Sequence, residues 1–260
     1  MKIERELKFS TTEEHVPSLA ELRQALGSSD LELPSMSIRR HIDSYYDDAH
    51  SSLQRAGWAL RKRRSRGVSS ERTPSATGAG TGSGSTDGSA SRTVAALKGA
   101  AQLDGALHSR QEIEVELDAG REPSDPGWPA AILAALPPAV DPRLLRELVE
   151  LRVRRVVVPV MRAGFAVAEL SFDEVVCSVP DAGNPSAAGA TLEETPHFTF
   201  HEVEIEALDD DSDGTTSLAT LEEVAAAVME SLPLVQSSTS KVQRATTLLG
   251  PFIEDKLSDA

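Results

Sequence analysis

Charged side chains alternate with apolar ones at the very start of the chain. In residues 2–9, Glu4, Glu6 and Lys8 stand at alternate positions, and the positions between them include Ile3, Leu7 and Phe9. Because successive side chains of an extended strand point to opposite faces, this segment is predicted to be a strand with one charged and one apolar face. Two carboxylates on one such face lie roughly 6.5–7 Å apart, and at an effective dielectric constant of about 20 their repulsion costs about 2–2.5 kcal/mol. The face therefore has to be open to water or hold cations between its carboxylates.

The same alternation recurs in later segments. Acidic side chains alternate with apolar ones at Glu112, Glu114 and Glu116, at Glu169 and Asp173, and at Glu202, Glu204 and Glu206. Basic side chains alternate at Arg61 and Arg63, and Arg154 opens a face with Val156 and Val158. One acidic strand is usually a solvated edge, but this many charged strands are better explained by a closed barrel, whose strands alternate inward and outward positions. The predicted fold class is α+β, with an eight-stranded antiparallel β-barrel (a tunnel), a charged interior and helices packed outside.

Composition restricts the partners and the compartment. The 260 residues include 41 acidic and 26 basic side chains and carry a formal net charge of −15, which argues against binding nucleic acid. The single cysteine, Cys177, excludes an intrachain disulfide and is typical of a reducing compartment. No apolar run approaches the length of a membrane span, and the charge at Lys2 argues against a secretory signal. We therefore expect a cytoplasmic protein with no nucleic-acid or membrane partner, either a monomer or a homodimer.

The chain is predicted to form one domain over residues 1–250, followed by a tail over 251–260. Residues 65–92 are mostly Ser, Gly and Thr, and such a composition cannot bury a core, so we expect a flexible insertion there. Strands are expected at residues 2–9, 38–47, 57–64, 93–98, 110–118, 148–161, 164–179 and 198–208. Helices are expected from a capping box near Ser10 to Leu26, at 129–136, at 217–231 and at 238–249.

The residues that could carry chemistry are carboxylates, lysines and arginines. There is no glycine-rich phosphate loop and no dinucleotide fingerprint, and the six histidines are scattered without the spacing of metal ligands. Carboxylate oxygens suit Mg²⁺ or Mn²⁺, whereas Lys and Arg bind phosphate. Phosphoryl transfer needs positioning, charge neutralisation and metal ions. This inventory favours a substrate that contains a chain of phosphates.

An ordered set of motifs resembles the CYTH family, the triphosphate tunnel metalloenzymes. Residues 4–8 match the Glu-x-Glu-x-Lys signature of that family, and later segments match in the same order: 45–47, 53–63, 97–98, 110–114, Arg154, 169–173, 202–206 and 240–244. The chain departs from the family at Asp48–Ala49, where many members have Thr-Pro, and at Ala245, where a Gly often stands. The insertion is a third departure. None of these changes a charged position of the expected tunnel.

The resemblance, which is greatest to bacterial inorganic triphosphatases, implies a role for each charged residue. Glu4, Glu6 and Lys8 would be catalytic. The phosphate chain would be bound by Lys8, Arg61, Arg63, Lys98, Arg154 and Lys241. Mg²⁺ or Mn²⁺ would be held by Glu4, Glu6, Glu112, Glu114, Asp173, Glu204 and Glu206. The remaining basic residues nearby are assigned to solvent or to the faces under helices: Arg55, Lys62, Arg64, Arg152 and Arg155.

Several activities are compatible with such a tunnel. The first is metal-dependent hydrolysis of a triphosphate, above all inorganic tripolyphosphate, with release of phosphate. The second, on the same fold, is a class IV-type adenylate cyclase or a thiamine triphosphatase. The third is a module that binds polyphosphate or a nucleotide without turnover. The chain has only two Trp and two Tyr, so we expect no aromatic cluster to stack a base, and this favours tripolyphosphate over ATP.

Overall fold

The computed structural model describes residues 2–69, 92–104, 107–117, 127–180, 196–208 and 215–258. Its strands are β1 (Lys2–Thr11), β2 (Leu31–Glu32), β3 (Ser37–Asp47), β4 (Ala59–Ser69), β5 (Arg92–Lys98), β6 (Gln102–Asp104), β7 (Leu107–Leu117), β8 (Arg146–Arg162), β9 (Phe165–Ser178), β10 (His197–Ala207) and β11 (Val235–Gln236). Its helices are α1 (Leu19–Leu26), α2 (Ser52–Arg55), α3 (Ala130–Ala135), a 3₁₀ turn at Pro142–Leu144, α4 (Thr215–Ser231) and α5 (Lys241–Ser258).

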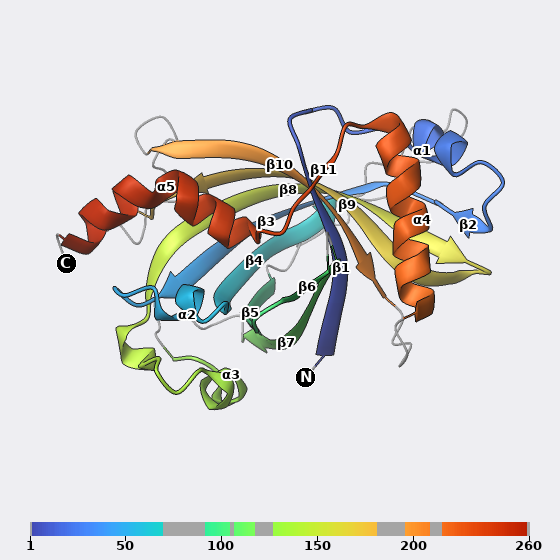
Figure 1. Ribbon diagram of the computed structural model, residues 1–260. Coiled ribbons are helices and arrows are strands. Elements are labelled where there is room, and N and C mark those ends of the chain that lie inside the picture. The colour runs from blue at the N-terminus through green and yellow to red at the C-terminus, as the bar shows by residue number, and fades with distance from the viewer. Residues whose placement is uncertain are drawn as a thin grey trace, which may run out of the picture.

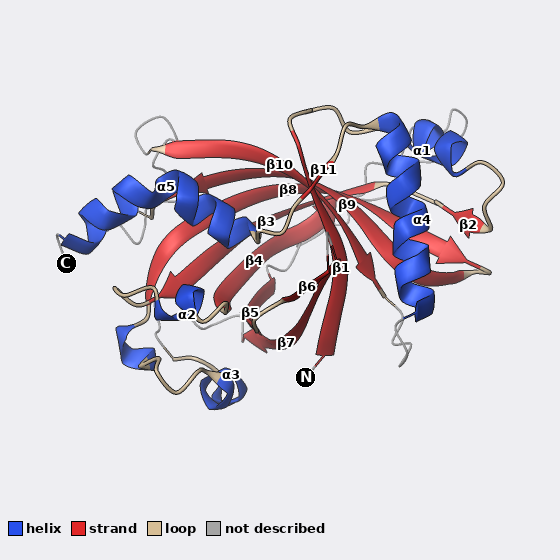
Figure 2. Ribbon diagram, viewed as in Figure 1, coloured by secondary structure: helices blue, strands red, loops and turns tan. Residues whose placement is uncertain are grey.

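Eight of these strands close into an antiparallel barrel. Their order is β1-β10-β9-β8-β3-β4-β5-β7, and β7 pairs with β1 to complete the ring. The register sets charged residues of opposite sign beside one another, as in Lys8 opposite Glu204 and Lys98 opposite Glu112. Figure 2 shows the strongly curved strands, with helices at their periphery. The predicted α+β tunnel fold is confirmed.

Two layers of helix cover the outward apolar faces of the barrel. Helices α1 and α4 lie side by side over the β1-β10-β9-β8 part (Figure 1), where Leu22 and Leu221 join a core that includes Ile205 and Leu170. On the other side, Leu53 of α2 and Ile132 of α3 pack with Trp128 and the outward residues of β4 and β5. The alternation read from the sequence thus has its expected cause, because one face of each strand is buried under helix.

Helix α5 is placed differently from the other helices. It packs on Val153, Val175 and Phe200 through Ala245 and Leu249. Each of these three strand residues shares a face with a charged inward side chain two positions away on the same strand. The inward face of β8, β9 and β10 therefore changes from charged to apolar towards one end, and α5 covers the apolar end (Figure 1).

Several boundaries differ from the sequence predictions. β1 continues to Thr11, and the first helix begins only at Leu19, behind a capping box in which Ser18 and Glu21 bond each other's backbone N–H. β4 extends to Ser69 and β5 starts at Arg92. The two ends of the expected insertion thus belong to strands, and residues 70–91 lie outside the described residues.

The last helix extends past its expected end at residue 249, into the segment expected to be a tail. Helix α5 runs through Pro251 to Ser258. The helix continues because Ala245, Leu249 and Ile253 recur every four residues and all face the same core. None of the described helices combines the length and the apolar character needed to cross a membrane.

Candidate functional site

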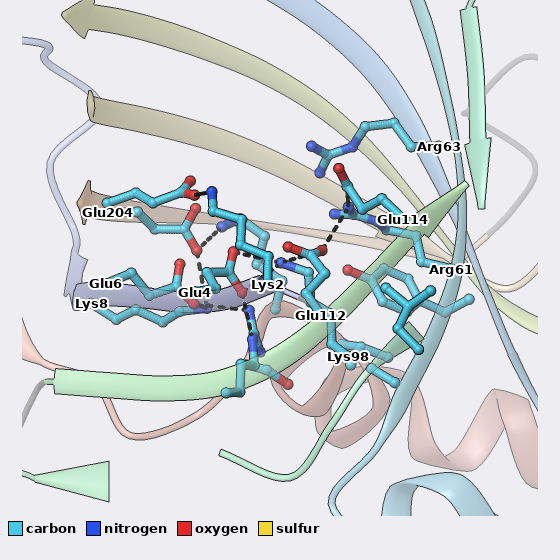
Figure 3. A pocket seen from close by; sticks show the side chains of 18 of the residues that line it. Lys2, Glu4, Glu6, Lys8, Arg61, Arg63, Lys98, Glu112, Glu114 and Glu204 are labelled. Carbon is cyan, nitrogen blue, oxygen red and sulfur yellow. Dashed lines mark hydrogen bonds and ion pairs between the residues drawn. The ribbon is translucent and has the colours of Figure 1, made fainter. Parts of the chain in front are cut away.

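A cavity of about 460 Å³ lies inside the barrel and carries charges of both signs. Eight basic and six acidic side chains line it, so the lining is basic although the whole chain is acidic. Figure 3 shows these side chains converging from strands on opposite walls. The charged lining residues are Lys2, Glu4, Glu6, Lys8, Arg61, Arg63, Lys98, Arg110, Glu112, Glu114, Arg155, Glu204, Glu206 and Lys241.

Most residues that the sequence assigned to a site lie in this lining. They are Glu4, Glu6, Lys8, Arg61, Arg63, Lys98, Glu112, Glu114, Glu204, Glu206 and Lys241. Asp173 lies just behind it, where its carboxylate is 2.6 Å from a guanidinium nitrogen of Arg155 and 3.0 Å from Nζ of Lys241. The structure therefore brings together the acidic and basic sets from strands that are far apart in the sequence.

Arg154 is the exception, and its assignment to the tunnel is corrected. Arg154 pairs with Arg40 and Glu174 on the outward face, whereas Arg155 pairs with Asp173 and faces the cavity. Arg154 shares a face with Val156 and Val158, which pack under the outer helices. The tunnel arginine of β8 is Arg155, which the sequence reasoning assigned to solvent or to a helix.

The first charge cluster joins β1 to β5 and β7. Lys98 and Arg110 each donate to the Glu4 carboxylate at 2.7 Å, and Arg110 also donates to Glu6 at 2.8 Å. Burial alone would raise the pKa of Glu4, but the charges of Lys98 and Arg110 outweigh it and hold that pKa well below its usual range. Glu4 is thus a carboxylate at any physiological pH.

A second cluster is centred on Glu204. Its carboxylate lies 3.1 Å from Lys8 and also contacts Arg155 and Lys241. Burial favours neutral Glu204, but Lys241, Lys8 and Arg155 lower its pKa well below the usual value. Burial likewise opposes the charge of Lys8, whose pKa is nonetheless raised by Glu6 and Glu204. The charges of this cluster stabilise one another, so the set acts as one unit.

A third cluster lies on the wall made by β3, β4 and β7. The fully buried Asp43 accepts two hydrogen bonds of 2.7 Å from Arg63. Arg61 lies 3.6 Å from Asp43, 3.9 Å from Glu112 and 3.5 Å from Glu114. Arg63 thus forms a bidentate ion pair with Asp43. The Arg61 guanidinium contacts three carboxylates at longer distances and is therefore freer to accept a new anion.

Glu206 is the least compensated carboxylate of the lining. Its nearest cation is Lys2, at 3.5 Å and half exposed. Burial, together with the negative charges of Glu4 and then Glu6, raises the pKa of Glu206 to about 7. An added cation beside Glu206 would favour its ionised form and lower this pKa.

Sequence reasoning missed four charged residues of the site. Arg110 has the same strand parity as Glu112, and Asp43 the same as Tyr45, so alternation could have found both. Lys2 likewise has the parity of Glu4. Arg155 could have been found only by weighing which face of β8 lies under helix.

The carboxylates suit a hard divalent ion in chemistry, although no metal centre is assembled in advance. Among the described residues, no three carboxylate, histidine or cysteine side chains are grouped closely enough to hold a metal ion. One oxygen of Glu112 and both oxygens of Glu202 are buried without a hydrogen bond in that part of the chain, although Lys98 lies 3.2 Å from that Glu112 oxygen and Lys241 lies 3.2 Å from one Glu202 oxygen. An all-oxygen donor set of this kind fits Mg²⁺ or Mn²⁺, and holding the ion would require carboxylates to exchange their Lys and Arg partners for it.

Neither a family model nor a curated protein sequence matches the chain. Several solved structures are similar over most of their length. One is a Hippeastrum protein described as an adenylyl cyclase candidate with a dominant triphosphatase activity (19% identity, 94% of this chain and 95% of that chain, TM-score 0.47). Another comes from Pyrococcus horikoshii (18% identity, 92% and 96%, TM-score 0.48), and a third is the mimivirus capping enzyme triphosphatase (14% identity, 86% and 89%, TM-score 0.39).

Similarity of this extent does not transfer an activity to the chain. The fold is defined by the strand order, by the closure of β1 on β7, and by the charged lining. These are the features that the resemblance to the triphosphate tunnel metalloenzymes predicts, and at the level of the fold that resemblance is confirmed.

Proposed function

We propose that this protein is a metal-dependent triphosphatase of the tunnel type that hydrolyses inorganic tripolyphosphate and releases phosphate. One observation supports the proposal most: eight basic and six acidic side chains line a single cavity of about 460 Å³ inside a closed barrel. That volume is in the range of small-molecule sites, which is about 300–1,000 Å³. A site for an anion alone would need the basic residues but not the six carboxylates.

The cations would bind the phosphate chain by exchanging partners. Lys8, Lys98 and Arg61 contact carboxylates in the structure, at 2.7 to 3.9 Å. Phosphate oxygens would replace some of these carboxylates on the cations, since Lys and Arg bind both groups through the same donors. The released carboxylates would then need a cation of their own, which explains why a catalytic tunnel keeps both sets.

The released carboxylates would hold the metal ions. The candidates are Glu4, Glu6, Glu112, Glu114, Asp173, Glu204 and Glu206, with Mg²⁺ or Mn²⁺ as the ion. Such an ion supplies charge neutralisation on the transferring phosphoryl group. The contribution of Glu4 and Glu6 would be to keep a fixed negative edge along β1 that orients the attacking water, and Lys8 would neutralise the phosphate beside them.

The cavity offers little to an appended organic group. Tyr45 is the one aromatic side chain among its described lining residues, and α5 covers the apolar end. Because base stacking on an aromatic ring is worth about 1–3 kcal/mol, its absence should remove roughly one to two decades of preference for a nucleotide. We therefore expect tripolyphosphate to be turned over faster than ATP, and no cyclic AMP to form.

Phosphate release at matched concentrations of tripolyphosphate, ATP and thiamine triphosphate, with Mg²⁺ and with Mn²⁺, tests the proposal. The expected order places tripolyphosphate first by about tenfold or more, and Glu4→Gln should lose at least about 100-fold in turnover. Faster cleavage of thiamine triphosphate would make that compound the substrate. Cyclic AMP formed faster than phosphate would indicate a cyclase, and tight binding of tripolyphosphate without turnover would indicate a binding module.

A further inference from the structure

Four arginines surround a second cavity, on the outside of the barrel. It has a volume of about 350 Å³ and is lined by Arg64 of β4, Arg40 of β3, and Arg152 and Arg154 of β8. The four arginines have the outward parity of their strands, opposite to that of Asp43 and the other tunnel residues. It is therefore separated from the tunnel by the sheet itself.

The strand register forces these positive charges together. Arg40 lies directly opposite Arg154, and Ile42 lies between Arg64 on one side and Arg152 on the other. Residues directly opposite in a sheet have Cβ atoms roughly 4.5–5.5 Å apart, and like charges there are destabilising. A bound anion would relieve this repulsion.

Carboxylates of the described residues compensate the cluster only in part. Arg152 donates to Glu150 at 2.8 Å. Glu174 stands opposite Arg154 and lines the same cavity, but Arg40, Arg64 and Arg154 form no ion pair within 4.0 Å in the part of the chain that the structure describes. In a protein with a net charge of −15, three arginines that have no ion pair among the described residues form a local patch of positive charge.

The floor of this cavity is apolar and half-buried. The outer helices α1 and α4 cover the same face as far as Ile38 and Val156. Beyond that point, Ile42 and Val176 line the cavity between the arginines. The site thus combines guanidinium groups at the rim with an apolar surface beneath them.

We propose that this outer cavity binds a phosphorylated small molecule with a planar or apolar body, the chemistry of a nucleoside diphosphate. Guanidinium groups hold phosphate through paired N–H donors and also stack on flat rings. The floor of Ile42 and Val176 would contact the body, while Arg40, Arg64 and Arg154 would hold the phosphates. This preference is the opposite of that of the tunnel, which offers charge and little else, and the proposal does not depend on the tunnel being catalytic.

Binding of ADP and of pyrophosphate, measured by calorimetry with a chelator present to remove divalent metal, tests this site. The pair shares a diphosphate and differs in the organic body. Arg40→Ala with Arg64→Ala removes two rim cations. The matched control, Arg55→Ala with Arg143→Ala, removes the same charge from exposed positions elsewhere. Thermal unfolding of both double variants checks that each is folded.

The expected result is that the native protein binds ADP at least tenfold more tightly than pyrophosphate. The rim variant should lose at least tenfold in ADP affinity, the control should stay within twofold, and triphosphatase turnover should be the same in both. Equal ADP affinity in rim variant and control would overturn the proposal. So would equal affinity for ADP and pyrophosphate, because the apolar floor would then contribute nothing.

Discussion

At the scale of single residues, two adjacent arginines have different surroundings. Arg155 is mostly buried and joins Asp173 and Glu204, whereas Arg154 faces outward. Arg155→Lys keeps the positive charge but loses the bidentate hydrogen bonding of the guanidinium. Because hydrogen bonds to charged groups are worth about 1.5–3 kcal/mol, we expect this variant to lower kcat/KM for tripolyphosphate by roughly tenfold or more. Arg155→Ala should in addition lower stability by about 3–5 kcal/mol, because it leaves two buried carboxylates short of a partner.

Arg154→Lys and Arg154→Ala are the matched controls. Both should retain turnover within about twofold, because Arg154 faces away from the tunnel. Both should also change stability by only about 0.5 kcal/mol, as is usual for surface substitutions away from a site. Steady-state kinetics and thermal unfolding on the four variants provide the comparison. If Arg154 were the residue whose loss impaired turnover, the assignment of the faces of β8 would be wrong.

Glu206 makes the stability of the folded protein depend on pH, and this dependence can be measured without substrate. Its ordinary pKa of 4.5 is raised to about 7 by burial and by Glu4 and Glu6. Between these two values the folded state holds a proton that the unfolded state has released, so stability should fall as pH rises from about 5 to about 8. The loss attributable to Glu206 should be on the order of 1–3 kcal/mol, because its side chain is 27% exposed.

Chemical denaturation of the metal-free native protein and of the Glu206→Gln variant, each at pH 5 and at pH 8, measures this loss of stability. The variant should have a smaller decrease in stability over that interval. Adding Mg²⁺ at pH 8 should stabilise the native protein more than the variant, by mass action on a carboxylate that is then ionised. If stability changed with pH in the same way in both proteins, the prediction would be wrong, and Glu206 would be compensated by a neighbouring positive charge when the protein is in solution.

At the scale of elements, strand alternation predicts the faces only where one face is apolar. It worked for β1, β7 and β10, whose inward positions carry charges beside apolar outward ones. It failed for β8, because both of its faces are buried: Val156 and Val158 lie under the outer helices, and Val153 lies under α5. No count of apolar residues on one strand can reveal that a distant helix covers the inside of a barrel.

The predicted end of the last helix, at residue 249, was wrong for a related reason. Gly250 and Pro251 are the residues that usually stop a helix, yet the helix continues because Ile253 still reaches the core formed with Val175 and Phe200. Packing over that core outweighs the local preference. Propensity alone could not show it, because the partners lie on three other elements.

Ile253→Ala should therefore lower the free energy of unfolding by about 2–4 kcal/mol, since Ile253 is buried within a core cluster. Phe252→Ala should cost less, because Phe252 is 36% exposed and contacts Phe198 at the rim. Urea denaturation of both variants distinguishes a packed helix from a tail. Unchanged stability in Ile253→Ala would restore the interpretation of residues 251–260 as a tail.

At the scale of the whole molecule, the barrel is a closed ring of strands with its charge inside. Closure explains why an acidic protein can present a basic-rich cavity: the eight basic side chains face inward, while acidic residues elsewhere set the net charge of −15. Closure also implies that the ring needs only β4 and β5 to be joined, not the particular sequence that joins them.

The low-complexity sequence between those strands is thus predicted to be dispensable. Ser65 pairs with Arg92, whereas β4 continues four residues further to Ser69, so a shortened connection must return about 13 Å along the strand. Deleting residues 73–88 leaves six linking residues, which reach roughly 20 Å when extended. Since a Ser, Gly and Thr composition cannot offset the entropy of ordering, we expect the melting temperature to stay within about 2 °C. Turnover of tripolyphosphate should stay within about twofold.

The control is a deletion of 66–91, which cuts into β4 and should lower stability because it removes the pairing of Arg66 and Ser69 with β3. A large loss of turnover with an unchanged melting temperature in the shorter deletion would show instead that this segment acts on the substrate.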